Sequence, residues 1–286
     1  MPPNMKKFKI VVKPKDEDPI VVLTRYLYIK QEVLASLSIS LIESNLEEAL
    51  FWAYELYYSG FQEECMEFIP AVYREWYAVK NPKLGKFLNS QLKKWLESRA
   101  DAVLGTMIRN IMNKEFYINP SGFGAGLLNK PSYDCAKDNG FYVQIDPAAI
   151  EKYKTIEKDD IELPYLVIRR SCKYTARNKQ NAIFCCFHKD ISKEDLYLIY
   201  RDHWLYYASF SPIWRKRIDD CNGYINNELK TVTFENEDDE EEFYDEFGYE
   251  PDEQPKDLLE KWIGDNSHQM QESYGMENLR ISDDLT

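Results

Sequence analysis

The residues from Asn45 to Gly60 constrain the fold more than any other stretch of the sequence. Asn45 can cap a helix, and Glu48, three residues on, completes a capping box for the backbone N–H groups at the helix start. Gly60 suits the left-handed conformation that often ends a helix. The intervening apolar residues occupy nearly every face: Leu46, Ala49, Leu50, Phe51, Trp52, Ala53, Leu56 and Tyr57. A helix that is apolar all round must be buried, so this stretch predicts a central helix.

Further helical periods surround this central helix. Apolar residues recur at helical spacing from Lys30 to about residue 115, and Asn81-Pro82 marks a break between helices. Short connections between such helices favour antiparallel neighbours. Before them, two β-like runs at 8–12 and 20–23 are separated by turn-forming residues, which favours a short hairpin or two edge strands. The sequence therefore predicts a β-hairpin plus a helical-hairpin bundle over residues 1–116.

The second half of the chain has a different pattern. Residues 117–162 are rich in glycine and proline and predict a loop-rich connector. Residues 163–234 predict a smaller α+β region, with strands at 163–168, 182–187 and 231–234. Its helices follow Ser192 and Ser211, the latter with Pro212 in the favoured first helical position.

The net charge of the chain is −13, but the negative charge is concentrated near one end. Residues 1–234 carry a net charge of +3, and residues 235–286 carry −16. Glu235 to Glu253 contain 12 carboxylates and no basic residue. Self-repulsion of this kind predicts a largely disordered, extended acidic tail over 235–286. The expected fold class is thus mainly α: a bundle, a smaller α+β region and a disordered tail.

The tail also contains apolar residues that could dock on a partner. Aromatic rings within an acidic segment are typical of sequences that bind basic grooves. A short amphipathic helix is expected at 257–263, and it could fold onto a partner or onto the chain itself. The candidate partner-docking residues are Phe243, Tyr244, Phe247, Leu258, Leu259, Trp262 and Ile263.

Basic residues gather in two places in the second half. The stretch from Tyr165 to Asn181 holds five cations and no acid, with tyrosines interleaved, and a second group lies beside Trp214. Lysine and arginine bind phosphates, and aromatic faces stack on unpaired bases. The candidate polyanion-binding residues are Arg169, Arg170, Lys173, Arg177, Lys179, Arg215, Lys216 and Arg217. One hypothesis is that the acidic tail covers the Arg169–Lys179 patch and competes with another polyanion.

No catalytic motif is present, so we expect a protein that is not an enzyme and holds no cofactor. A Cys–His nucleophilic pair using Cys186 or Cys221 remains an alternative, because such partners meet in space. The spacing of Cys185 and His188 would suit two zinc ligands, but no second pair of ligands stands at a matching distance. We therefore interpret this stretch as a buried strand, in which cysteine acts as a small apolar residue. Scattered cysteines favour free thiols in an intracellular compartment. The mean hydropathy of −0.55 and the lack of a long apolar run argue against a membrane protein.

Two stretches carry a resemblance. Residues 45–61, NLEEALFWAYELYYSGF, and residues 203–214, HWLYYASFSPIW, resemble motifs in uncharacterised proteins of nucleocytoplasmic large DNA viruses. The resemblance implies a viral protein that acts in the host cytoplasm or in the virion, and it identifies no functional residue.

The expected function is protein–protein interaction or assembly, through aromatic-rich helices and the acidic tail. Tyrosine is favoured at interfaces, and this chain has 21 tyrosines, which exceeds what one core requires. The alternative is a nucleic-acid-associated factor that binds through the Arg169–Lys179 patch, with the tail as autoinhibitor. A protein partner or self-assembly is therefore expected, and nucleic acid is the second candidate.

Overall fold

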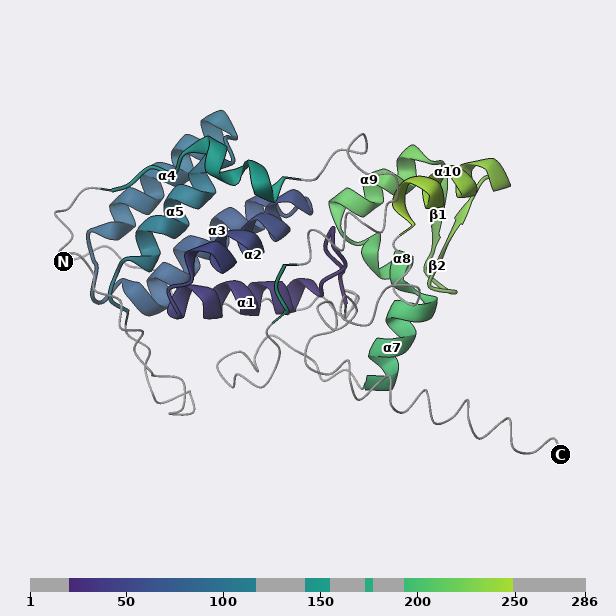
Figure 1. Ribbon diagram of the computed structural model, residues 1–286, viewed down its shortest axis with the longest axis horizontal. Coiled ribbons are helices and arrows are strands. Elements are labelled where there is room, and N and C mark those ends of the chain that lie inside the picture. The colour runs from purple at the N-terminus through teal and green to yellow at the C-terminus, as the bar shows by residue number, and fades with distance from the viewer. Residues whose placement is uncertain (1–20, 117–141, 155–172, 177–192, 249–286) are drawn as a thin grey trace.

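The computed structural model describes residues 21–116, 142–154, 173–176 and 193–248 (Figure 1). These residues are mainly helical and form two regions along the long axis of the molecule. An N-terminal bundle contains α1 to α5, and a C-terminal region contains α7 to α10 and a two-stranded sheet. The expected class, mainly α with a smaller α+β part, is confirmed.

The N-terminal bundle is built around α2 (Leu46–Tyr58), which packs against α1 (Lys30–Ile42), α3 (Gln62–Val72) and α5 (Ala102–Met112). Every residue of α2 from Glu48 to Tyr57 is buried, as its all-round apolar pattern predicts. The Asn45 cap is confirmed, because the backbone N–H of Glu48 donates to Asn45 Oδ1 at 3.2 Å. The Asn45 backbone N–H, which a capping box would pair with the Glu48 side chain, donates instead to the Ser40 carbonyl at 3.0 Å. The Asn45 side chain in turn donates to Glu48 Oε2 at 3.0 Å.

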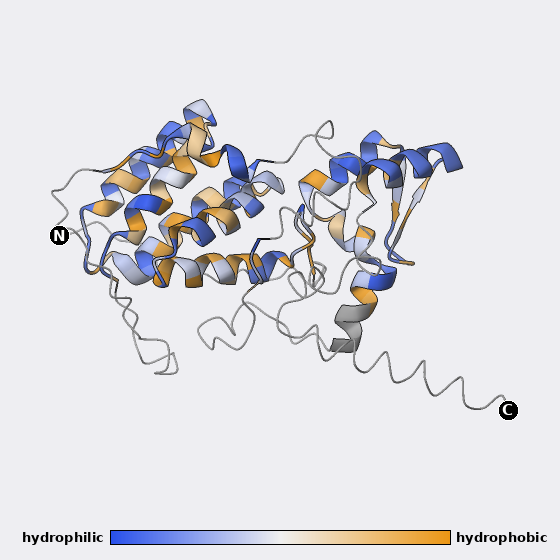
Figure 2. Cartoon of the chain, in the orientation of Figure 1, coloured by the Kyte–Doolittle hydropathy of each residue, from blue (hydrophilic) through white to orange (hydrophobic). Residues whose placement is uncertain are grey.

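Pro70 lies inside α3, and a proline within a helix commonly causes a kink or a break. The chain instead stays helical and widens into a π-helical turn, η1 (Tyr73–Tyr77), in which Ala78 N–H donates to the Tyr73 carbonyl at 2.8 Å. After Pro82, α4 (Leu84–Ser98) begins and packs on α3 and α5. In Figure 2 hydrophilic and hydrophobic residues alternate along these helices, as expected for helices with one polar and one apolar side.

The C-terminal region has α7 (Lys193–Asp202), α8 (Trp204–Ala208) and α9 (Pro212–Asp220), followed by the hairpin of β1 (Gly223–Asn226) and β2 (Thr231–Phe234). The strands are antiparallel, and Gly223 pairs with Phe234. The helix beginning at Pro212 and the strand over 231–234 are therefore confirmed. The strands expected at 8–12, 163–168 and 182–187 lie outside the described residues.

The segment 21–29 joins the two regions. It lies against α2 on one side and against α8 and α9 on the other, and every residue in it is buried except the half-buried Val22. The Trp214 indole donates to the Thr24 carbonyl at 3.0 Å, and Leu23 N–H donates to the Tyr207 carbonyl at 3.3 Å. Of the predicted N-terminal hairpin, the structure describes only residues from 21 onward. These contain a single antiparallel β-bridge, between Leu23 and Ile29, and the segment lies between α2 and the helices α8 and α9.

Part of the predicted connector is not a free loop. Pro147–Tyr153 form a 3₁₀ helix, η4, whose Ile150 and Tyr153 side chains are buried against the bundle. Asp146 caps it by accepting from Ala148 N–H at 3.0 Å, and Asn110 of α5 holds Val143 through two hydrogen bonds. The sequence interpretation did not anticipate this short helix, because Asp-Pro starts a helical turn as readily as a loop. The rest of the predicted connector, apart from residues 142–146 and 154, lies outside the described residues.

The prediction of a disordered, extended tail does not hold for residues 237–247. Glu237–Phe247 form the helix α10, capped by the Asn236 side chain, which accepts from Asp239 N–H at 2.9 Å. Its acidic side is hydrophilic throughout in Figure 2, whereas Phe243 on the other side is fully buried. Burial of an aromatic stripe and acids at the positive helix N-terminus offset the carboxylate repulsion. Residues 249–286 lie outside the described part.

Candidate functional site: two oppositely charged helix faces

The candidate docking residues on α10 belong to the core. Phe243 is 0% exposed and contacts Trp214, with ring centroids 6.4 Å apart, and Phe234, at 4.9 Å. Tyr244 and Phe247 pack against the same core. These rings attach α10 to α9 and β2. The fully buried Phe243 is therefore not available to a partner in this fold, whereas Tyr244 and Phe247 are half-buried. Leu258, Leu259, Trp262 and Ile263 lie outside the described residues.

The other side of α10 presents only carboxylates. Five acids on this side are exposed: Glu237, Asp238, Glu241, Glu242 and Asp245. Residues 235–248 contain nine acids and no basic residue. We call the five exposed acids the acidic face. Because the apolar residues at 243 and 247 are spaced by one turn, the acids between and around them are turned toward solvent.

The candidate polyanion-binding residues are only partly described, and three of the four described ones, Lys173, Arg215 and Arg217, make contacts within the chain. Lys173 Nζ lies 3.4 Å from Glu47 Oε2, beside the bundle. Arg215 pairs with Asp219 on α9 at 3.3 Å, and the Arg217 guanidinium lies over the Trp214 and Phe247 rings at 4.4 Å and 4.6 Å from their centroids. Lys216 is exposed. Arg169, Arg170, Arg177 and Lys179 lie outside the described residues.

The strongest basic surface among the described residues is one that the sequence interpretation did not single out. Residues 80–99, which include α4, contain six basic residues and one acid, a net charge of +5. The lysines of this segment are Lys80, Lys83, Lys86, Lys93 and Lys94, and all five are exposed. We call them the lysine face. Within the described residues none of the five forms an ion pair.

The geometry of α4 explains how this face forms. Leu84, Leu88, Gln91 and Trp95 are buried and make the stripe that packs on the bundle. At 100° per residue, Lys86 and Lys93 lie on the opposite side of the helix from that stripe. The sequence contained this information, since the apolar period that predicts α4 also fixes which lysines face outward. The remaining cation, Arg99, is paired with Glu63 at 2.8 Å.

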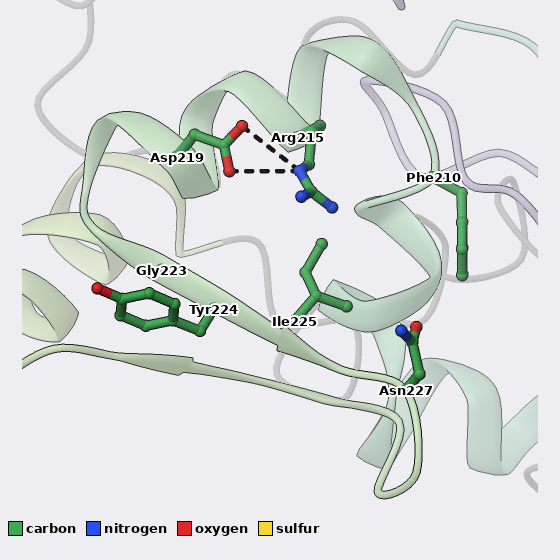
Figure 3. Close-up of a pocket in the computed structure, with 7 residues that line it drawn as sticks. All are labelled: Phe210, Arg215, Asp219, Gly223, Tyr224, Ile225 and Asn227. Atoms are coloured by element: carbon green, nitrogen blue, oxygen red, sulfur yellow. Dashed lines mark hydrogen bonds and ion pairs between the residues drawn. The ribbon is translucent and has the colours of Figure 1, made fainter.

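A groove of about 410 Å³ lies between α9 and β1 (Figure 3). Its lining residues are Phe210, Arg215, Asp219, Gly223, Tyr224, Ile225 and Asn227. Figure 3 shows the Arg215 side chain between Asp219 and Ile225, held by the ion pair with Asp219. Asn227 accepts a hydrogen bond from the Tyr206 hydroxyl at 3.4 Å. The charged groups of the groove therefore neutralise each other, and nothing in it selects a ligand.

A second groove of about 340 Å³ lies between α8 and β2. Two of its charged residues are paired, since Arg201 Nη2 lies 2.6 Å from Asp202 Oδ2, and His203 Nδ1 lies 2.9 Å from the Lys230 backbone carbonyl. The pKa of Asp202 is lowered by its hydrogen bond to Arg201. This arrangement fixes the approach of the hairpin to α8, and it leaves His203 with a structural hydrogen bond.

The described cysteines do not have the environment of a nucleophile. Burial raises the pKa of the Cys65 thiol, and burial together with the α10 carboxylate of Glu242 raises the pKa of Cys221. A raised pKa keeps both in the unreactive thiol form at neutral pH. Cys185, Cys186 and His188 lie outside the described residues. In the part of the chain that the structure describes, no group of three or more His, Cys, Asp or Glu side chains could hold a metal ion.

A buried polar network lies between segment 21–29, α2 and η4. Arg25 Nε lies 2.9 Å from Glu55 Oε2, and Arg25 Nη2 donates to the Tyr153 carbonyl at 2.6 Å. The Tyr54 ring stacks on Tyr58 and on Tyr153, at centroid distances of 5.6 Å and 5.3 Å. Neither of the two grooves described above is lined by these groups. The network fastens three elements together, and most of the tyrosines predicted for an interface are used in such internal contacts.

Comparison with known proteins identifies no relative. No protein-family model matches the chain, and neither the curated proteins nor the solved structures contain a significant match. Among the described helices, none is both long enough and apolar enough to cross a membrane. The two stretches that carry the viral resemblance lie mainly in α2 and in α8 and α9, where they supply buried core residues.

Proposed function

We propose that this chain is a non-enzymatic interaction or assembly protein whose partner-binding surfaces are the lysine face of α4 and the acidic face of α10. The observation that carries this proposal is the presence of two exposed helix faces of opposite charge, neither of which is neutralised within the described residues. Complementary charged surfaces steer association and set its specificity. The composition led us to expect aromatic side chains at the interface. In this proposal they instead pack in the core, beneath the helices that carry the charged faces.

Exposed apolar residues near the lysine face support this reading. Leu96 is 56% exposed on α4, between the lysines and Arg99, and Val79 is 73% exposed beside Lys80. An interface commonly combines an apolar contact with a charged rim. We also propose, from the resemblance of 45–61 and 203–214, that the chain is a viral protein of the host cytoplasm or virion.

The proposal is tested by affinity capture from the native source, comparing the wild-type chain with two charge-reversed variants. Lys86→Glu/Lys93→Glu changes the lysine face, and Glu241→Lys/Asp245→Lys changes the acidic face. We expect at least one captured protein to be lost with one of these variants and kept with a control, Lys216→Glu/Lys230→Glu. An identical set of captured proteins for all four chains would refute the proposed function.

A second candidate function is association with nucleic acid. The five exposed lysines favour it, because unpaired ammonium groups along a helix can contact successive phosphates. The described members of the originally predicted patch favour it less, since Lys173 and Arg215 are already paired with carboxylates. Anisotropy of a labelled single-stranded oligonucleotide tests it: specific use of α4 requires weaker binding by Lys86→Glu/Lys93→Glu and a strong dependence on salt.

A further inference from the structure

The lysine face and the acidic face are complementary to each other. Lys86 and Lys93 of the lysine face lie on α4, opposite its buried apolar stripe, and the acidic face lies on α10, opposite the buried Phe243. Lys86 and Lys93 are seven residues apart, about 10.5 Å along the helix axis, and Glu237 and Asp245 are eight apart, about 12 Å. Two helices side by side could therefore place both lysines opposite carboxylates. Leu96 would add an apolar contact at the end of the lysine face.

In both helices, some of the charged residues lie at the end where the helix dipole disfavours their charge. The first turn of α4 contains Lys86, next to Lys83, and no acid, although a helix N-terminus favours negative charge. On α10, Asp245 and Glu246 lie near the C-terminus, which favours positive charge. The carboxylates spaced four apart also repel one another. An opposing surface of the other sign would relieve both sets of unfavourable interactions.

One molecule cannot bring these two faces together. α4 lies at one end of the long axis of the molecule and α10 at the other (Figure 1). Between them lie the rest of the bundle and segment 21–29, which is buried and bonded to both sides. The acidic face of α10 can therefore meet the lysine face only on a second copy of the chain.

Resting on the proposed interaction function, we propose that copies of this chain associate head to tail, with the lysine face of α4 on one copy bound to the acidic face of α10 on the next. Such a contact joins two different surfaces, so each added copy presents a new free face. It produces an open series of oligomers, or a ring where the rotation between copies closes. Its strength falls with ionic strength, since both faces are exposed to solvent.

Sedimentation velocity of the full chain over a concentration series tests this proposal. At about 0.1 M salt, where the Debye length is about 10 Å, we expect the mean sedimentation coefficient to rise with concentration. At about 1 M salt, where the Debye length is about 3 Å, we expect monomer. Lys86→Glu/Lys93→Glu and Glu241→Lys/Asp245→Lys should each weaken self-association by more than about tenfold, because like charges then oppose each other.

The decisive sample is a mixture of the two charge-reversed variants. In each variant alone, one face keeps three of its five original charges beside two of the opposite sign, so its contact with the other face is weakened. The mixture offers an unchanged lysine face on one variant and an unchanged acidic face on the other, and it should regain association. The substitutions suit their helices, because Lys86→Glu places an acid in the first turn of α4 and Asp245→Lys places a base in the last turn of α10. Controls with equal charge changes elsewhere, Lys216→Glu/Lys230→Glu and Glu67→Lys/Glu228→Lys, should associate like the wild type.

The outcomes separate this inference from the proposed function. A wild-type chain that is monomeric at about 0.1 M salt at every concentration overturns the head-to-tail contact. So does self-association that survives both reversals, or a mixture that stays monomeric. If affinity capture still shows a foreign protein that depends on either face, the interaction function stands without self-assembly. If the lysine face instead binds only the labelled oligonucleotide, nucleic acid is its partner and the head-to-tail contact is wrong.

Discussion

The Arg25 guanidinium and the Glu55 carboxylate form an ion pair of 2.9 Å in which the two side chains are 2% and 0% exposed. Glu55 also accepts from the Tyr26 backbone N–H at 3.0 Å, and Arg25 lies over the Tyr26 and Tyr58 rings. The pair therefore fixes the path of segment 21–29 across α2. A buried charge left without its partner is strongly destabilising, and this makes the pair a sensitive point of the fold.

Replacing Glu55 by Gln keeps the shape of the side chain and leaves the Arg25 charge uncompensated. We expect the free energy of unfolding to fall by about 3–5 kcal/mol, measured by urea titration followed by circular dichroism. The matched control is Glu63→Gln, which removes the exposed partner of Arg99 and should cost less than about 1 kcal/mol. Equal effects of the two substitutions would contradict the structural role of the buried pair.

Phe243→Ala tests whether α10 is held by its aromatic side. Removing a fully buried phenylalanine should lower the stability by about 3–5 kcal/mol, and the loss should be concentrated in α10. Hydrogen exchange provides the measurement: amides of residues 240–247 should lose protection, while those of α2 keep theirs. Asp245→Ala, on the exposed side, is the control. Unchanged exchange in α10 after Phe243→Ala would show that this ring does not hold the helix.

Gly60→Ala tests the contact between the α2–α3 turn and α9. Gly60 has φ of 98°, and an added Cβ would lie 2.4 Å from Pro212 Cβ. Backbone strain and overlap together should cost more than about 1 kcal/mol in the free energy of unfolding. The double variant Gly60→Ala/Pro212→Gly, which removes the Cβ, Cγ and Cδ atoms of Pro212, should recover the part due to overlap and keep the part due to φ. A double-mutant cycle with no coupling would contradict the contact.

Stability should also fall at alkaline pH. Burial raises the pKa of Tyr54, of Tyr77 and, together with the Asp101 hydrogen bond, of Tyr58 above the usual value of about 10. The folded state therefore binds these protons more tightly than the unfolded chain, so their contribution is complete below about pH 10 and is lost as the pH rises further. Urea titrations from pH 8 to 11 measure the slope.

The contribution of Tyr77 to the loss of stability at alkaline pH can be measured with a single substitution. Tyr77 donates only a long hydrogen bond, 3.4 Å, to the Leu41 carbonyl, so Tyr77→Phe should reduce the alkaline loss while costing little at pH 8. Tyr224→Phe changes a ring that is 59% exposed and serves as the control. If Tyr77→Phe left the slope as steep as in the wild type, burial of this hydroxyl would not contribute to it.

The central helix could be predicted from the sequence because its signals are local. Asn45 and Glu48 cap it through neighbouring backbone groups, and its apolar surface admits only burial. The helical course of α10 was missed for the opposite reason. Repulsion among its acids is a local property, whereas the burial of Phe243 depends on Trp214 and Phe234, brought near by the tertiary fold.

For the charged faces too, the local sequence pattern predicted some features, and others depended on tertiary packing. The spacing of Leu84, Leu88 and Trp95 was sufficient to locate Lys86 and Lys93 on the outer side of α4. What the sequence could not provide was the pairing of other cations, such as Arg215 with Asp219, and the placement of α4 and α10 at opposite ends of the molecule. Those properties follow from the packing of the two regions. The spacing of apolar residues along α4 therefore located exposed lysines more reliably than the local density of basic residues did.

The position of segment 21–29 has a consequence for biosynthesis. The carbonyl of Thr24 accepts its hydrogen bond from the indole of Trp214, which lies 190 residues later in the chain. During translation the helices of the bundle can form early, yet one side of Val21 and Leu23 has no cover until α8 and α9 have emerged from the ribosome. A chain released before Trp214 would expose an apolar strip, a recognisable mark for chaperones or proteases. Segment 21–29 thus acquires its complete packing only after α9 has been made.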